Sequence, residues 1–194
     1  TTQTAFTGDT NPAGAEVYLF GGNLGFLADD CVVRGLTHLQ LRFEGSRNVI
    51  EDNSNLGLTF YRGSGSVIRR NNGGFVMLDQ SNNNVVVGNT LGRVRVAGWT
   101  AGGFPATGNR IGGPAAADRN YILGYGTWST HGTPGGFAVQ IFDTDSTLLE
   151  NNWIGTLPDG MTPANPATTL GVGIEDQNSN TIVRNNHEIA ADAY

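Results

Sequence analysis

Two arginines in one short segment are spaced so that their side chains could act together. Arg93 and Arg95 alternate with valines in the stretch Arg93-Val94-Arg95-Val96, which is the pattern of a half-buried strand. In an extended chain both guanidinium groups project from one face, where they could hold a carboxylate or a sulfate through paired hydrogen bonds. Arginines on an exposed strand are also commonly only solvated, so both interpretations stay open.

A second pair with the same spacing, Asp143 and Asp145, follows an apolar run. If the strand continues through them, both carboxylates face one side, which suits the acid and base of glycoside hydrolysis or a pair of Ca²⁺ ligands. Aspartates after a strand also commonly form turns. His131 is the one histidine near aromatic residues and is a third catalytic candidate. No residue spacing suggests zinc, so we predict no metal site and no cofactor, with Ca²⁺ as the one alternative.

A repeat of 18 residues supplies the elements that must position these side chains. Its copies begin at Val49 (VIEDN), Val67 (VIRRN) and Val85 (VVVGN), and echoes follow at Leu148 and Ile182. A constant period of this length, with short apolar runs and an Asn turn, is typical of chains that stack coil upon coil. We therefore expect each strand to lie directly above its copy one coil earlier, with the three valines in a shared interior.

This pattern predicts an all-β fold, a right-handed parallel β-helix (solenoid) of about seven coils, with residues 1–194 as a single domain. No ten-residue segment has apolar residues at helical spacing, and hairpin turns would not keep the register. A left-handed hexapeptide helix also has a period of 18, but it needs an aliphatic residue at every sixth position, and asparagines interrupt that frame. We expect residues 1–16 to be irregular and residues 187–194 to form a frayed or truncated end.

Asparagine occurs 20 times, and five copies are predicted to hold the coils together. Asn side chains at equivalent turns can bond one above the next, and Asn tolerates the left-handed backbone that such a bend requires. The predicted stack consists of Asn53, Asn71, Asn89, Asn151 and Asn185. We assign these residues a structural role and no chemistry.

Five segments resemble the repeats of bacterial right-handed β-helix proteins of the pectate-lyase-like, secreted or surface-anchored type. They are 109–113 (NRIGG), 119–123 (RNYIL), 135–141 (GGFAVQI), 152–156 (NWIGT) and 170–174 (LGVGI). The resemblance implies a groove between loops, over the outward face of one sheet, in which such proteins hold glycans. It also implies that a lyase of this kind would take its base from Lys or Arg, and this chain has no Lys.

Strand alternation predicts which side chains face that groove. We expect strands at 57–61, 75–79, 93–97, 137–142 and 170–175, flanked by loops at 97–108, 124–136 and 156–169. Sugar rings would stack on aromatic faces, and charged or amide groups would bind hydroxyls. The predicted binding residues are Tyr61, Asp79, Arg93, Arg95, Trp99, Trp128, Gln140 and Glu175.

The charge balance excludes some partners. A net charge of −6, with 11 arginines and no lysine, argues against nucleic acid and against anionic membrane surfaces. No apolar run is long enough for membrane insertion. Cys31 has no second cysteine to pair with, and we expect it to be a small buried apolar residue. Because the chain begins at Thr1, we expect a processed product or a piece of a longer protein.

Two functions remain open. The favoured one is an extracellular β-helix module, secreted or on the cell surface, that is structural or binds a polysaccharide or cell-surface glycan. It lacks a clear catalytic constellation, and its open β-helix ends would permit self-association. The alternative is a polysaccharide lyase or glycoside hydrolase that acts in the same groove, so the sequence leaves open whether the protein is an enzyme.

Overall fold

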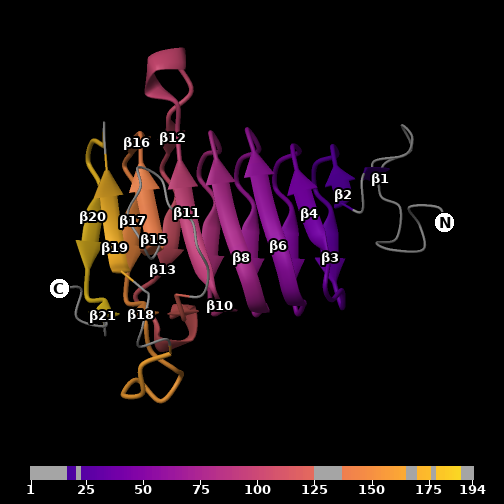
Figure 1. Cartoon of the computed structure of the whole chain (residues 1–194). Helices are drawn as coiled ribbons and strands as arrows, with labels where there is room; N and C mark the ends of the chain where they lie inside the picture. Colours follow the sequence, from indigo (N-terminus) through magenta and orange to yellow (C-terminus); the bar gives the residue numbers. More distant parts are fainter. Residues whose placement is uncertain (1–16, 21–22, 125–136, 165–169, 176–177, 189–194) are drawn as a thin grey trace.

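The computed structural model describes residues 17–20, 23–124, 137–164, 170–175 and 178–188. In this part of the chain, strands lie side by side in order along one axis, from β2 near the amino-terminal end to β20 near the carboxyl-terminal end (Figure 1). Two long sheets run the length of the stack, and their strands pair in parallel with counterparts from neighbouring coils. The predicted all-β parallel β-helix is confirmed.

The larger sheet has 12 strands. They are β1 (Val17–Phe20), β2 (Asn23–Phe26), β4 (Gln40–Phe43), β6 (Ser54–Tyr61), β8 (Asn72–Asp79), β10 (Thr90–Leu91), β11 (Arg93–Ala97), β14 (Tyr121–Ile122), β15 (Phe137–Phe142), β18 (Trp153–Ile154), β19 (Leu170–Glu175) and β21 (His187–Glu188). All pairs but one are parallel: β1 and β2 pair antiparallel, so the stack opens with a hairpin that the repeat did not predict.

Strand β8 runs around a corner and joins two parts of this sheet. Its first residue, Asn72, pairs with Thr90 of β10, whereas its second half pairs with β11. Gly73 and Gly74 lie between the two halves with φ angles of 83° and 76°, a left-handed conformation that glycine adopts without steric cost. Beyond this corner the coils divide into a β10-β14-β18-β21 path and a β11-β15-β19 branch.

The smaller sheet has seven strands, β3 (Val32–Arg34), β5 (Val49–Glu51), β7 (Val67–Arg69), β9 (Val85–Val87), β13 (Arg110–Gly112), β17 (Leu148–Glu150) and β20 (Ile182–Arg184). Since each strand comes from a different coil, this number agrees with the predicted seven coils. Two short strands, β12 (Ala106–Thr107) and β16 (Thr144–Asp145), pair separately, and two 3-10 helices, η1 (Thr100–Gly102) and η2 (Ala116–Asp118), lie in loops.

The core fills the space between the sheets with rows of apolar side chains. One row crosses the larger sheet through Leu58, Val76, Val94 and Val139, all at most 1% exposed. At the amino-terminal end, Phe26, Phe43 and Phe60 form a buried stack with ring centroids 4.6 and 4.8 Å apart. Burial of such rows is the main favourable term in a fold whose coils contact only their neighbours.

The three repeat valines pair in register as predicted, but their side chains do not face the core. Val49 pairs with Val67, and Val67 with Val85, yet all three are only half-buried. The following residues, Ile50, Ile68 and Val86, are 0% exposed instead. The prediction of a shared interior for the valines was therefore wrong by one residue. Because successive side chains of a strand point to opposite faces, a shift of one residue puts the valines on the outer face and the next residues in the core.

A ladder of asparagine side chains crosses the coils. Each amide Nδ2 donates a hydrogen bond to the Oδ1 of the Asn in the next coil, at distances of 2.8 to 3.0 Å. The members are Asn53, Asn71, Asn89, Asn120, Asn152 and Asn186. The same Oδ1 atoms also accept backbone N–H groups, such as Asn71 N–H at 2.9 Å from Asn89. The ladder satisfies polar groups that burial would otherwise leave unpaired.

Two members of the predicted ladder were wrong. Asn151 and Asn185 lie one residue before the ladder, with left-handed φ angles of 55° each. Asn152 and Asn186 supply the ladder amides instead. Asp52 and Arg70 occupy the equivalent left-handed position before Asn53 and Asn71, with φ of 56° and 53°. The turn therefore consists of a left-handed residue followed by an inward-facing Asn.

A second ladder runs along the other side of the smaller sheet's strands and was not predicted. Backbone N–H groups donate to a side-chain oxygen one coil further on, through Cys31 to Asn48, Asn48 to Ser66, Ser66 to Asn84 and Asn84 to Asn109. All four acceptor residues are 0% exposed. Cys31 is itself buried, as expected.

Apolar side chains remain uncovered at the carboxyl-terminal end of the described stack. Ile174 and Ile182 are each 50% exposed and Val183 is 42% exposed. Ile174 pairs with buried Ile141, and Val183 with buried Leu149, so both continue core rows. Self-association through the ends stays a prediction.

Candidate functional site

The outward side chains of strands β4, β6, β8, β11 and β15 form one continuous surface, which we call the outer strip. These strands are joined in that order by parallel pairing, and their register aligns side chains in rows across the sheet. One row contains Arg42, Thr59, Met77, Arg95 and Gln140, and another contains Tyr61, Asp79, Ala97 and Phe142.

The structure brings five of the predicted binding residues onto this strip: Tyr61, Asp79, Arg93, Arg95 and Gln140. The alternation that placed them there is visible in β11, where Val94 and Val96 are 1% and 0% exposed while both arginines are half-buried. The aromatic and charged groups of the strip therefore come from different coils, and only the stacking of those coils makes them neighbours.

The two arginines of β11 lie on the same side of the sheet, as a clamp for an anion requires. The Arg95 guanidinium carbon lies 4.6 Å from the ring centroid of Phe142, and that of Arg93 lies 5.7 Å from the ring centroid of Phe75. Burial and, to a smaller extent, the positive charge of Arg95 together lower the pKa of Arg93 to about 10. The Arg93 side chain still carries its charge at neutral pH, so two cations face outward together.

Aromatic rings and arginines alternate at the end of the strip where β6 and β11 finish. The Tyr61 ring lies between Arg42 and Arg62, whose guanidinium carbons are 4.6 and 4.9 Å from its centroid. Arg62 also lies 4.3 Å from the centroid of Phe104, and Phe104 stacks with Trp99 at 6.3 Å. We call Tyr61, Arg62, Phe104 and Trp99 the aromatic corner.

The loop after β11 holds the two exposed rings of this corner. Trp99 and Phe104 form an isolated antiparallel bridge, with hydrogen bonds of 2.8 and 3.0 Å between their backbones. The turn between them is η1, and a Cβ added to Gly102 would lie 2.5 Å from the Trp99 ring, so the ring lies flat against that backbone. Trp99 is 53% and Phe104 41% exposed. Figure 1 shows this loop projecting beyond the strand ends.

Asp79 is the carboxylate nearest to the centre of the outer strip. It pairs with Tyr61 on one side and Ala97 on the other. Burial raises its pKa above the usual value, and the charges of Arg95 and Arg42 oppose that effect. Within the described part of the chain, no group donates a hydrogen bond to this carboxylate. A half-buried acid with a perturbed pKa and no donor, on an otherwise ordered surface, is a candidate for ligand contact.

Three of the predicted site residues have side chains outside the described part of the chain. Trp128 and His131 fall in 125–136, outside the described residues. Glu175 is the last residue of β19 and pairs with Phe142, which continues the row of Tyr61 and Asp79. Its side chain also lies outside the described part.

The aspartate pair is not arranged as the sequence suggested. Strand β15 ends at Phe142, and Asp143 has a left-handed φ of 51°, so the strand does not continue through both residues. Asp145 accepts hydrogen bonds from Ser179 Oγ at 2.7 Å and Asn180 Nδ2 at 2.9 Å. These bonds lower its pKa, Ser179 first. Ser179 and Asn180 lie in the next coil, so these contacts of Asp145 join two coils.

The predicted binding residues did not include Arg42, Arg62 or Phe104, although Phe104 lies in the predicted flanking loop 97–108. Arg42 could have been found, because Gln40-Leu41-Arg42-Phe43 alternates like the later strands and Leu41 and Phe43 are buried. Arg62 follows the last residue of β6, and Phe104 comes from a loop outside the repeat. Arg62 lies 18 residues before Gln80, to which its side chain donates a hydrogen bond of 3.2 Å, so the repeat could have placed it. No periodic signal places Phe104.

Among the residues that the structure describes, no three His, Cys, Asp or Glu side chains gather as a metal site would require. Over the same residues, no helix is both long and apolar enough to span a bilayer. The prediction that left Ca²⁺ open stays a prediction.

The repeat, the two parallel sheets and the polar ladders define the class to which this chain belongs, a parallel β-helix repeat protein. Comparisons with protein-family models, with curated proteins and with solved structures found no match to the chain. The assignment to this class therefore rests on the structure alone.

Proposed function

We propose that this protein is a polysaccharide-binding β-helix module of the pectate-lyase-like kind, secreted or displayed on a cell surface, and that the outer strip with the aromatic corner holds the glycan. The observation that carries the proposal is the position of two exposed rings, Trp99 and Phe104, at the end of a strip that also holds a half-buried carboxylate without a donor. Exposed rings beside polar groups suit sugars, because a pyranose has apolar faces and a rim of hydroxyls.

Each part of the strip has a distinct task in this proposal. The Trp99 and Phe104 rings stack against sugar faces, the Asp79 carboxylate accepts hydrogen bonds from hydroxyls, and Arg95 pairs with a uronate or sulfate group. Arginine suits the last task because its planar fork matches a carboxylate or sulfate. The glycan would cross several coils, since these residues come from β8, β11 and the loop that follows.

A glycan array followed by titration calorimetry tests the proposal. Replacing Trp99 by Ala should weaken binding by roughly fivefold or more, because an aromatic contact contributes about 1 kcal/mol. Val32→Ala is the control, since Val32 is 38% exposed and lies in β3 of the smaller sheet, away from the outer strip and its flanking loops. If wild-type protein binds no glycan, or if Trp99→Ala binds as tightly as Val32→Ala, the outer strip is not the binding surface.

A second candidate function, cleavage of the bound polysaccharide by a lyase or hydrolase reaction, is favoured by one observation. Asp79 lies half-buried on the outer strip and burial raises its pKa, which is the direction of shift that suits a carboxyl to proton transfer. Product analysis separates the two candidates. New reducing ends or unsaturated uronates that disappear in Asp79→Asn would support cleavage, whereas binding without turnover in the wild type would support the module.

A further inference from the structure

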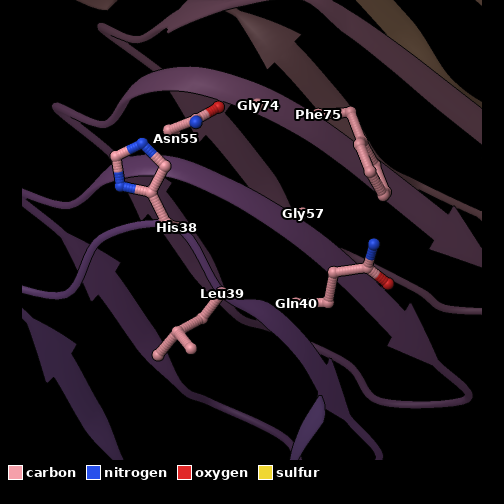
Figure 2. A pocket seen from close by; sticks show the side chains of 7 residues that line it. All are labelled: His38, Leu39, Gln40, Asn55, Gly57, Gly74 and Phe75. Atoms are coloured by element: carbon pink, nitrogen blue, oxygen red, sulfur yellow. The ribbon is translucent and has the colours of Figure 1, made fainter. Parts of the chain in front are cut away.

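A separate hollow lies on the same outward face, near the start of the strands rather than at their ends. Its volume is about 260 Å³, and it is lined by His38, Leu39, Gln40, Asn55, Gly57, Gly74 and Phe75. Figure 2 shows the imidazole of His38, the amides of Gln40 and Asn55 and the phenyl ring of Phe75 arranged around Gly57. None of these residues belongs to the aromatic corner.

Two glycines create this hollow. Gly57 occupies a position in β6 where the neighbouring strands present Gln40 and Phe75. A Cβ on Gly57 would lie 2.8 Å from the Phe75 ring, so the ring leans over the bare backbone. At Gly74 a Cβ would collide with the Leu56 carbonyl oxygen. The floor therefore carries no side chain, and one wall is the flat ring of Phe75.

Polar side chains at the rim of the hollow can form hydrogen bonds with a ligand. The side-chain amides of Gln40 and Asn55 are exposed and make no hydrogen bond within the described part of the chain. His38 Nδ1 lies 2.7 Å from Thr37 Oγ1, which leaves Nε2 for a ligand. His38 and Asn55 both have left-handed backbones, with φ of 56° and 52°, a conformation in which Asn and His are enriched among non-glycine residues.

We infer that this hollow binds one uncharged pyranose unit of a glycan, with Phe75 against a sugar face and the amides of Gln40 and Asn55 on its hydroxyls. An aromatic wall with amide donors and acceptors suits a ring that is apolar on its faces and polar at its rim. No carboxylate or guanidinium lines the hollow, which favours a neutral sugar over a uronate. The inference rests on the proposed glycan binding and deepens it.

The hollow and the aromatic corner lie on the same strands and are too far apart for one sugar. Gly57 and Tyr61 are four residues apart in β6, as are Phe75 and Asp79 in β8, which is about 13 Å along a strand. The two sites would contact different units of one chain. The outer strip then recognises a neutral unit at one end and an acidic or hydroxyl-rich unit at the other.

Titration with two probes tests the inference: a neutral oligosaccharide from the array hits and an acidic disaccharide that reaches only the corner. Gln40→Ala and Asn55→Ala should each weaken the neutral probe by about fivefold to tenfold, the effect of one lost hydrogen bond. Both should leave the acidic probe unchanged. Phe75→Ala should weaken the neutral probe more strongly. Asn72→Ala is the control, because Asn72 is an exposed Asn of β8 outside the hollow.

The outcomes separate the two proposals. If Gln40→Ala and Asn55→Ala bind the neutral probe as Asn72→Ala does, while Trp99→Ala loses glycan binding, the hollow is not a subsite and the proposed function stands. If the wild type binds neither probe, both proposals fail. Gln40 is exposed and its backbone is extended, so its loss should not disturb folding. Asn55→Ala carries the left-handed strain of about 1–2 kcal/mol, and circular dichroism checks that each variant is folded.

Discussion

At the scale of single residues, the most unusual group is Asp79, whose environment works against its charge. Burial raises its pKa, and the opposing charges of Arg95 and Arg42 do not offset that effect. An acid that binds its proton more tightly in the folded state lowers the stability of that state once it ionises. A binding surface that keeps such a group sacrifices some stability for the sake of a ligand contact.

Replacing Asp79 by Asn should therefore stabilise the protein near neutral pH. The folded-state pKa is above the unfolded value, so the cost of ionisation is absent below the ordinary pKa of 3.8 and grows as the pH rises through the folded-state pKa. Asn has no charge to bury. Denaturant unfolding at several pH values should show a gain in unfolding free energy near neutrality that disappears in acid. A gain independent of pH would mean that the charge is not the cause.

Gly74 offers a second test, because it combines a left-handed backbone with a crowded site. Gly103 has nearly the same φ, 79° against 76°, but an added Cβ there meets open space. Gly103→Ala should cost about 1–2 kcal/mol of unfolding free energy, the price of a left-handed Ala. Gly74→Ala should cost clearly more, since its Cβ would also collide with the Leu56 carbonyl. Equal losses in thermal unfolding would show that the corner in β8 can relax.

At the scale of elements, the asparagine ladder holds each coil to the next. Asn71 is 4% exposed, donates to Ile50 O and Asn89 Oδ1 and accepts from Asn53. Asn71 also donates to Arg69 O within its own coil. Its bonds to Ile50, Asn53 and Asn89 lead to other coils, so no coil satisfies all of these groups alone. The ladder is therefore the polar counterpart of the apolar rows in the core.

Asn71→Ala should destabilise the protein by about 3 kcal/mol, because several buried donors and acceptors lose their partner at once. Asn185→Ala is the matched control. Asn185 is exposed and lies outside the ladder, so its replacement should cost no more than the left-handed strain of about 1–2 kcal/mol. Chemical denaturation of both variants decides the matter, and a larger loss for Asn185→Ala would contradict the ladder assignment.

The same strands show which features of the fold and of the candidate site could be predicted from the sequence. The 18-residue period correctly paired Val49 with Val67 and Val85, since stacking fixes register. The period did not show which side chains of these strands face the core, and the valines were wrongly predicted to do so. Val and Ile are both apolar, so no alternation of apolar and polar residues distinguishes the two faces. In β11 the alternation of Arg and Val did distinguish the faces, so Arg95 was correctly placed on the outward side. Phe104 could not be placed, because its position depends on a loop without periodicity.

At the scale of the whole molecule, arginine–carboxylate pairs join coils on the surface of the smaller sheet. Arg70 contacts Glu51 at 2.8 Å and Asp52 at 2.9 Å in the preceding coil, and Arg69 also contacts Glu51. Hydrogen bonds from Arg69 and Arg70 lower the pKa of Glu51, and one from Arg70 lowers that of Asp52. The lowered pKa values of Glu51 and Asp52 stabilise the folded protein near neutral pH, whereas the raised pKa of Asp79 destabilises it.

Stability should therefore fall as the solution is acidified. A carboxyl whose folded-state pKa is depressed stabilises the protein above its unfolded pKa, and this stabilisation is lost as the pH falls through the folded-state value. Arg70→Ala should reduce stability near neutral pH and make the acid decline shallower. Arg110→Ala is the control, since Arg110 lies in β13 of the same sheet, makes no ion pair with the described residues and does not contribute to the pKa shifts of Glu51 and Asp52. The melting temperature of each variant is measured as a function of pH. If the curves of wild type and Arg70→Ala run parallel, the arginine–carboxylate pairs do not cause the loss of stability in acid.

The outer strip draws its side chains from several successive turns of the solenoid. A ligand lying across it would act as a brace, fastening together segments of chain that otherwise meet only their immediate neighbours. Longer oligomers should then protect more turns from local opening than short ones do, so that the length of the bound glycan sets how much of the solenoid becomes rigid.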